Sequence, residues 1–105
     1  MITDYLGFGI ENAVSRKRLE HLSGFDDRKN RDLILHARFK GHIIINIGDG
    51  LGYFKLESYK TRKRDHTPEE TAAMLRQYRA TQSRGKAILG SNKPLERELK
   101  HLGLL

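Results

Sequence analysis

The stretch HIIINIGDGLGYF, residues 42–54, decides the fold, because it can be interpreted in two ways. A strand followed by glycines begins many phosphate-binding loops, and it is equally typical of a β-hairpin. A Walker loop needs Lys-Ser or Lys-Thr after its last glycine, but Tyr53 and Phe54 follow Gly52. A dinucleotide-binding fingerprint needs G-x-x-G spacing and then a helix, whereas the strand-like segment YFKLE follows here. The sequence therefore favours a hairpin whose glycines supply the positive φ values of a tight turn.

Two short helices are predicted before this hairpin. The first covers residues 15–23, with Ser15 as its N-cap, and Gly24 follows where a helix end favours a left-handed residue. The second begins after its N-cap Asp26 and runs to Gly41. Its buried face is expected to consist of Asn30, Leu33, Ile34 and Ala37. Helix, turn, helix, strand, turn, strand is the order of a winged helix-turn-helix.

The rest of the chain reads as an extension of that unit. Residues 59–66 are basic and without periodicity, and we interpret them as a linker. Thr67, Pro68 and Glu70 form a full helix start with a capping box. This helix is expected to break at residues 90–92, and a last helix should run from about Pro94 to Gly103. The first residues form either one turn of helix or an extended arm on the core.

The predicted fold class is thus α+β and mainly helical. A winged helix-turn-helix with a two-stranded wing occupies residues 1–58, the basic linker residues 59–66, and a C-terminal helical extension residues 67–105. The chain of 105 residues is long enough for one small domain with a single core.

Composition points to a polyanionic partner. Lys and Arg number 20 against 13 Asp and Glu, a formal net charge of +7, and such a surplus favours nucleic acid, although it also fits a merely solvated surface. The absence of cysteine excludes disulfides and thiolate metal sites and fits a reducing cytosol. No apolar run approaches the roughly 20 residues of a membrane span, and no signal peptide is recognisable.

The basic residues fall into two runs. Residues 16–40 contain eight Lys and Arg, and residues 55–64 contain five. In a winged helix these runs lie on the two helices and on the second wing strand with its exit, so both are expected along a DNA backbone. The candidate DNA-binding residues are Arg16, Lys17, Arg18, Arg28, Lys29, Arg31, Asp32, Lys55, Lys60 and Arg62.

Different roles are expected within this set. Arg28, Arg31 and Asp32, at the start of the second helix, are the candidates for contact with base edges in the major groove. Lys29 and the cations of residues 16–18 should meet phosphates, which fix position without reading sequence. The wing tip, residues 49–51, should touch the adjacent minor groove or the backbone.

Catalysis and metal binding are not expected. The five histidines include no pair with the i, i+4 spacing of helical metal ligands, and no carboxylate completes a set. No nucleophile has a base nearby in the sequence, and helix capping explains Asp26 and Asp27 better than an acidic catalytic pair does. We therefore predict no enzyme activity, no metal and no cofactor.

The sequence also resembles a group of small winged helix-turn-helix proteins encoded by phages and prophages of Firmicutes. The resemblance rests on ENAVSRKRLEHLSGFDDRKNRDLILHARFKGHIIINIGDGLGYF and on the tail QYRATQSRGKAILGSNKPLERELK, and it covers residues 11–100. It implies a DNA-binding domain and leaves the target DNA open. One departure is Asn30, which stands where such domains usually place an apolar residue such as Val. It weakens one core position or gives Asn30 a capping or turn-bonding role.

The function expected is binding of double-stranded DNA, as a phage or prophage transcriptional regulator or replication accessory factor in the cytoplasm and nucleoid of a bacterial host. The alternative is a non-enzymatic adaptor that uses the winged helix to bind other proteins. Apolar residues crowd residues 67–105, and exposed apolar patches usually mark interfaces. We therefore expect a homodimer through the C-terminal helices. The alternative is that the tail folds back and completes a monomer.

Overall fold

The computed structural model describes residues 1–105, apart from the side chain of Ala87. Its α-helices and strands are α1 (Arg16–Ser23), α2 (Asp27–Phe39), β1 (Ile43–Asn46), β2 (Tyr53–Leu56), α3 (Pro68–Arg84) and α4 (Lys93–His101). Three 3₁₀ segments are η1 (Ile2–Tyr5), η2 (Ile10–Asn12) and η3 (Lys86–Asn92). The chain is therefore α+β and mainly helical, and its order of elements is compatible with a winged helix.

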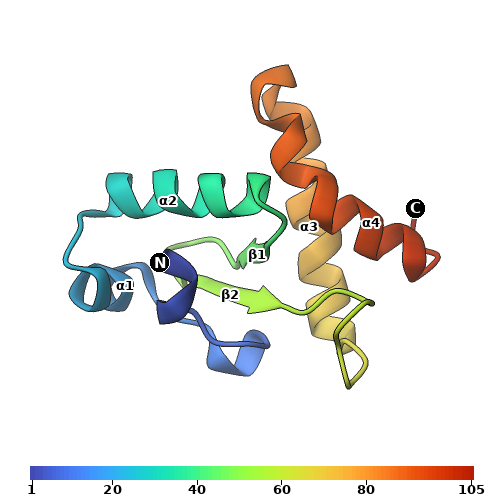
Figure 1. The fold of residues 1–105 in the computed structure, drawn as a ribbon, viewed down its shortest axis with the longest axis horizontal. Helices are drawn as coiled ribbons and strands as arrows, with labels where there is room; N and C mark the ends of the chain where they lie inside the picture. Colours follow the sequence, from blue (N-terminus) through green and yellow to red (C-terminus); the bar gives the residue numbers. More distant parts are fainter.

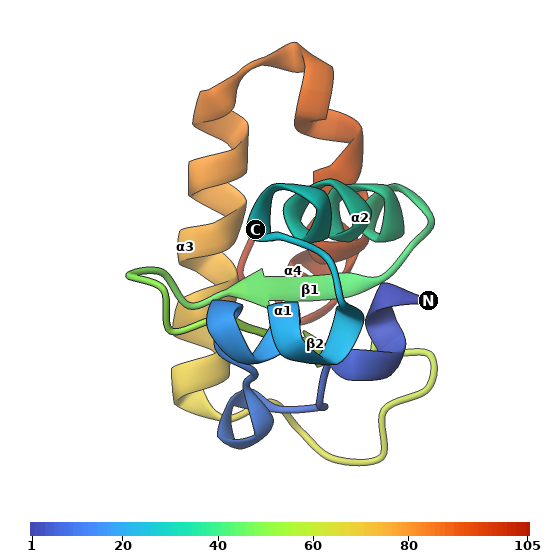
Figure 2. The same ribbon diagram turned by 90° about the vertical axis from the view of Figure 1, so that its left-hand side faces the viewer.

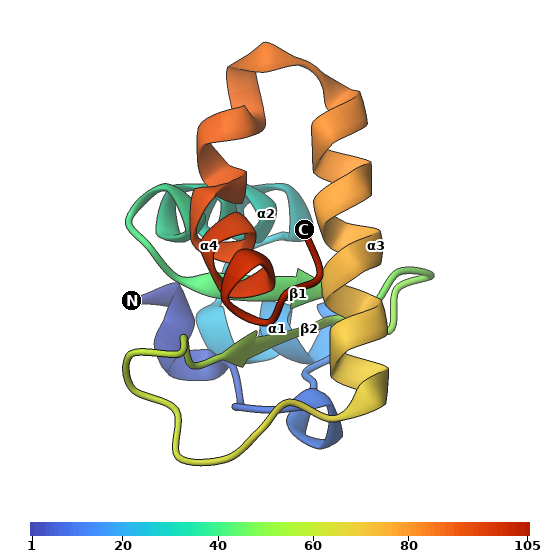
Figure 3. The ribbon, with the colours of Figure 1, turned by 90° about the vertical axis from the view of Figure 1, so that its right-hand side faces the viewer.

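The antiparallel β1–β2 hairpin lies in the middle of the molecule, with helices on both of its faces (Figure 1). One face packs against α3 and α4 in a cluster of Ile43, Ile45, Phe54, Leu56, Ala73, Met74, Leu95 and Leu99. The other face packs against α1, α2 and η1 in a cluster of Ile2, Leu6, Leu19, Ile34, Ala37, Ile44 and Tyr53. Seen from the side, α3 and α4 lie in front of the hairpin and α1 and α2 behind it (Figure 3). Burial on both faces explains three consecutive isoleucines in a strand of four residues.

Helices α1 and α2 and the turn between them form as their capping residues predict. The Ser15 hydroxyl accepts a hydrogen bond from the Arg18 N–H at 3.1 Å, and the Asp26 carboxylate accepts one from the Lys29 N–H at 2.8 Å. Gly24 ends α1 in the left-handed region, at φ 77°. The turn between α1 and α2 is thus fixed by contacts within a few residues.

Asn30 has the turn-bonding role that the sequence left as one of two options. Its side chain is buried, its Oδ1 accepts from the Ser23 hydroxyl at 2.8 Å, and its Nδ2 donates to the Phe25 carbonyl at 3.3 Å. A buried amide is tolerated when its donors and acceptors are paired. Asn30 therefore replaces apolar packing at this position with hydrogen bonds that connect α2 to the end of α1 and to the turn.

The hairpin turn confirms the prediction that the glycines serve a turn. Gly48, Gly50 and Gly52 all have positive φ, as does Asp49 between them. Gly52 is constrained most, because an added Cβ would lie 1.8 Å from the Val14 carbonyl oxygen. The N-terminal segment runs against the hairpin here, and Val14 and Tyr53 exchange two backbone hydrogen bonds of 2.9 Å. The turn itself projects sideways past α3 (Figure 2).

The N-terminal and C-terminal segments differ in detail from what the sequence predicts. The first residues form both a turn of helix, η1, and an arm with isolated bridges to β2. The helix after Pro68 ends at Arg84 instead of continuing to residue 90, because Gly85 has φ 118° and starts the 3₁₀ segment η3. Residues of the predicted extension, such as Met74 and Leu99, share one cluster with the hairpin, so the extension covers a hairpin face. No helix in the described part of the chain is long and apolar enough to cross a membrane.

Candidate nucleic-acid interface

The first basic run lies on the outer surface of α1 and α2. The cations in this set are all exposed: Arg16, Lys17, Arg18, Arg28, Lys29 and Arg31. Asp32 is also exposed, one turn after Arg28. Ile34 and Ala37, on the opposite side of α2, are buried in the core and hold the helix in place. The fold thus brings together seven of the ten candidate residues on one helical pair.

Two of these arginines share a carboxylate. Asp27, in the first turn of α2, accepts a hydrogen bond of 3.1 Å from Arg16 Nε at its Oδ1, and its Oδ2 forms an ion pair with Arg31 Nε, also at 3.1 Å. The Arg16 and Arg31 side chains remain 46% and 60% exposed. Exposed pairs contribute only about 0.2–1 kcal/mol. A phosphate or a base edge can therefore compete with Asp27 for either guanidinium.

Lys55, from the second basic run, is engaged inside the chain. Its ammonium donates to the Thr3 carbonyl at 2.9 Å and lies 4.4 Å from the centroid of the Phe8 ring. Both partners belong to the N-terminal segment, which the sequence left as helix or arm. Lys55 therefore attaches the N-terminal segment to β2, and its expected contact with a DNA backbone stays a prediction.

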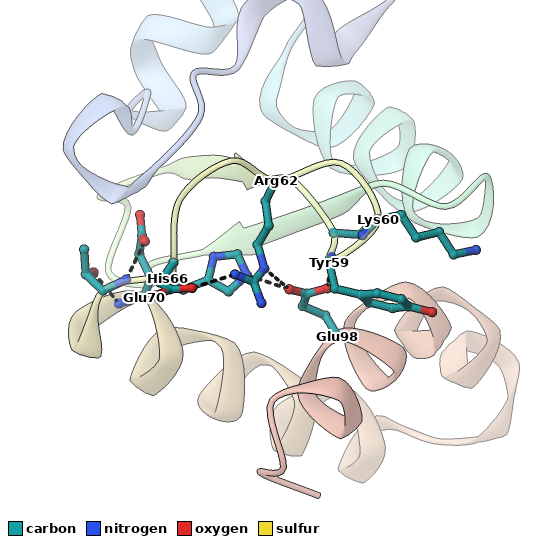
Figure 4. A network of polar contacts seen from close by, with 9 residues as sticks. Tyr59, Lys60, Arg62, His66, Glu70 and Glu98 are labelled. Carbon is teal, nitrogen blue, oxygen red and sulfur yellow. Dashed lines mark hydrogen bonds and ion pairs between the residues drawn. The ribbon is translucent and has the colours of Figure 1, made fainter.

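Arg62 is engaged as well, in a network around a buried carboxylate (Figure 4). Glu98 of α4 is fully buried, and it accepts from Arg62 Nε at 3.1 Å and from the Tyr59 N–H at 2.5 Å. His66 Nε2 lies 2.7 Å from the same carboxylate. Lys60 is exposed and extends away from this network (Figure 4).

The segment 59–66 is therefore no free linker. Besides the bonds to Glu98, the Tyr59 ring stacks on His101 of α4, with the centroids 4.1 Å apart. Arg62 NH1 also forms an ion pair with Asp65 at 2.9 Å. These contacts fasten the segment to α4, and of its predicted DNA contacts only Lys60 stays on the surface.

A second buried carboxylate, Glu70, holds the start of α3. It closes the predicted capping box by accepting from the Thr67 N–H at 2.9 Å, and it also accepts from the Ile10 N–H at 2.9 Å. Arg64 NH2 lies 3.5 Å away. Burial alone would raise the pKa of Glu70, but the two N–H donors and the nearby Arg64 charge outweigh it and lower that pKa. Glu70 is therefore held as a carboxylate at neutral pH.

A groove beside α2 gathers residues that the sequence did not single out. It measures about 430 Å³ and lies between α2, the turn end of the hairpin, the second half of α3 and η3. Its polar lining includes Arg28, Arg31, Arg38, Asn46, Gln77 and Arg84. Arg38 could have been found from its position seven residues after Arg31 on the helix, but nothing local links Arg84 to α2.

The described residues hold no cluster of three or more His, Asp or Glu side chains that could bind a metal ion. Comparison with protein families, with curated proteins and with solved structures finds no match to this chain. The candidate interface therefore rests on the geometry of the chain's own residues.

Proposed function

We propose that this protein binds double-stranded DNA through a winged helix-turn-helix, with α2 in the major groove. The observation that carries the proposal is the outer surface of α1 and α2, where the six cations of residues 16–18, 28, 29 and 31 face solvent on a helix pair fixed by caps and core. Cations on a rigid helix suit the combination of phosphate contacts and base readout. The β1–β2 turn would then lie against the backbone or the adjacent minor groove.

Roles within the surface follow from position. Arg28, Arg31 and Asp32 lie in the first two turns of α2, where recognition helices contact base edges. Arginine favours N7 and O6 of guanine, and an aspartate accepts from N4 of cytosine. Arg16, Lys17, Arg18 and Lys29 would contact phosphates, and Lys60 would add one contact at a distance from α2. We leave Lys55 and Arg62 out of the proposed interface because both are bonded within the chain.

The biological setting that we propose is a phage or prophage regulator or replication accessory factor in the bacterial cytoplasm and nucleoid. It rests on the sequence resemblance. Selection of bound sequences from a random duplex pool tests it, because a defined motif is expected of a regulator or initiator. The symmetry of that motif reports the oligomer.

A homodimer through α3 and α4 is also proposed, and fewer apolar residues support it than the sequence indicated. Met74, Leu95 and Leu99 contributed to the apolar surplus that motivated it, and all three are buried in the chain's own core. Leu104 and Leu105 remain 42% and 49% exposed. Light scattering at micromolar concentration should give a dimer mass if the exposed C-terminal leucines hold two chains together. A monomer mass would refute the homodimer.

The adaptor function keeps one observation in its favour. Leu22 and Phe25, at the turn between α1 and α2, are 38% and 48% exposed. Salt distinguishes the two functions, because the logarithm of a DNA-binding constant falls linearly with the logarithm of salt concentration, whereas apolar contacts lack this dependence.

The direct test is fluorescence anisotropy of a labelled duplex titrated with the protein at several salt concentrations. The expected result is saturable binding with a steep salt dependence. Failure to bind any duplex at micromolar protein in low salt would refute the proposal, and metal-dependent nicking of the duplex would overturn the expectation of no catalysis.

A further inference from the structure

The groove beside α2 contains arginines that have no counter-ion in the chain. Arg38 lies in the last turn of α2, and Arg84 is the last residue of α3. Among the described side chains neither forms an ion pair. Asp32 is the one carboxylate in the groove lining, against four arginines. The groove is thus strongly cationic.

Arg38 is held in an unusual position for a charged group. Its Nε donates to the Ile44 carbonyl at 3.0 Å, which fixes the guanidinium against β1. Its NH2 nitrogen is buried and has no hydrogen-bond partner among the described residues. Burial, helped by the nearby Arg84 charge, lowers the pKa of Arg38 to about 10, so it still carries its charge at neutral pH. A buried donor without a partner and a charge without a counter-ion are both costly.

The arrangement of the groove matches an anion approaching α2. Arg28, Arg31 and Arg38 are spaced three and seven residues apart, which places them along one side of the helix. Arg84 faces them from the end of α3, across the groove, with Gln77 and Asn46 as further hydrogen-bonding groups. In Figure 2, α3 and the hairpin turn lie together on one side of α2. A polyanion that reaches this side of α2 therefore also meets the end of α3.

We infer that this groove is a binding site for a phosphate group, and that the phosphate it takes belongs to the backbone of the DNA bound by α2. A planar guanidinium can bind two phosphate oxygens at once, which suits the part of the groove where Arg38 of α2 and Arg84 of α3 lie near each other. Arg28 and Arg31, nearer the start of α2, keep their proposed contacts with base edges. The inference rests on the proposed function for the source of the phosphate. It gives the C-terminal helices a part in DNA binding, because α3 supplies Arg84.

The test compares Arg84→Ala with the control Arg79→Ala. Both arginines are exposed on α3 and form no ion pair among the described side chains, but only Arg84 lines the groove. Thermal unfolding should show that both variants stay folded. Arg84→Ala is expected to reduce the magnitude of the salt slope of duplex binding by about one, the value for one lost phosphate contact, while Arg79→Ala leaves it unchanged. Equal slopes in both variants and the wild type would overturn the inference and leave the proposed function standing.

A second measurement separates the groove from DNA binding as such. The Nε–Hε signals of Arg38 and Arg84 are followed by NMR during titration of the whole chain with inorganic pyrophosphate. Shifts of these two signals, with that of Arg79 unmoved, support the groove even if no duplex binds and the proposed function fails. Unmoved Arg38 and Arg84 signals would refute the groove as a phosphate site. Saturable ATP binding below millimolar concentration, lost in Arg84→Ala while duplex binding is unaffected, would overturn the assignment to backbone phosphate.

Discussion

Residues 16–40 and 55–64 are both basic in sequence, but the structure uses their charges in opposite ways. Apart from Arg38, the first segment keeps its cations in solvent, and the carboxylate that two of them share, Asp27, is itself near the surface. In the second, Lys55 donates to the Thr3 carbonyl and Arg62 to the buried Glu98. The difference lies in the partners, which come from distant parts of the chain. A basic run therefore indicates a binding surface only after its internal partners are known.

The largest effect is expected from breaking the second segment's network. Glu98→Ala leaves Arg62, His66 and the Tyr59 N–H without their shared acceptor, and removal of one partner from a buried ion pair costs about 3–5 kcal/mol. The free energy of unfolding, measured by urea denaturation, should fall by that amount. Lys60→Ala, an exposed cation in the same segment, serves as the control and should stay within about 0.5 kcal/mol of wild type. A loss below about 1 kcal/mol for Glu98→Ala would mean that the network behaves like a surface ion pair.

Substitutions of the exposed cations in the first segment should change DNA-binding affinity and leave the free energy of unfolding nearly unchanged. Arg31→Ala is expected to weaken binding to a selected DNA site by about 1–3 kcal/mol and to relax preference at one base pair. The exposed pair with Asp27 adds little to folding, so the free energy of unfolding should change by less than about 1 kcal/mol. Anisotropy on the selected site and on single-base variants measures both quantities. Unchanged affinity and preference would show that α2 presents a different face to DNA.

The buried carboxylate of α3 predicts a pH dependence. Because the pKa of Glu70 is lower in the folded chain than its usual value of 4.5, Glu70 stabilises the fold above about pH 4.5 and loses this contribution as the pH falls through the lowered pKa. At pH 7, Glu70→Gln should cost about 1–3 kcal/mol, since one backbone N–H loses its acceptor. This difference from wild type should shrink as the pH falls below about 4.5.

Urea denaturation at pH 7 and at several pH values below 4.5 measures the difference in the free energy of unfolding between wild type and Glu70→Gln. Glu69→Gln, which is exposed in the same helical turn, is the control for the loss of one charge. A difference between wild type and Glu70→Gln that is the same at every pH would contradict the assignment of Glu70 as a stabilising carboxylate.

The smallest effect is expected at Lys17, on the exposed surface of α1. Lys17→Ala should weaken binding to all duplexes alike and reduce the magnitude of the salt slope by about one, because a phosphate contact carries no sequence information. Its thermal unfolding should match that of wild type. A loss confined to one DNA sequence would instead assign Lys17 to base readout.

Contacts within a few residues were predictable. The caps at Ser15, Asp26 and Thr67, the left-handed Gly24 and the glycine turn of the hairpin all form as the sequence indicates. Each depends on one side chain or one backbone conformation acting on its immediate neighbours, so the short-range pattern is sufficient evidence. Phe54 and Leu56 lie in one cluster and Tyr53 in the other, as the alternation of side chains along a strand requires.

The candidate site was predictable only in its first half. The cations of α1 and α2 stand on helices whose buried faces the sequence identifies, so their exposure follows from periodicity. Arg62 gave no such indication, because its partner Glu98 lies 36 residues away. The apolar residues of the C-terminal extension suggested a dimer interface. In the structure, however, Met74 and Leu99 cover one face of the hairpin.

By itself the sequence determined the hairpin, its two flanking helices and the charge on them, since caps, turns and periodicity act over one or two turns of chain. Only the tertiary structure decided where the C-terminal helices go. Gly85 ends α3 early, the chain returns through η3, and α4 brings Glu98 under residues 59–66. The packing of α3 beside the hairpin brings Arg84 into the same groove as Arg38. These contacts between distant segments form because α3 and α4 bury the apolar face of the hairpin that α1 and α2 leave uncovered. Burial of that face depends on the whole core and not on any short stretch of sequence.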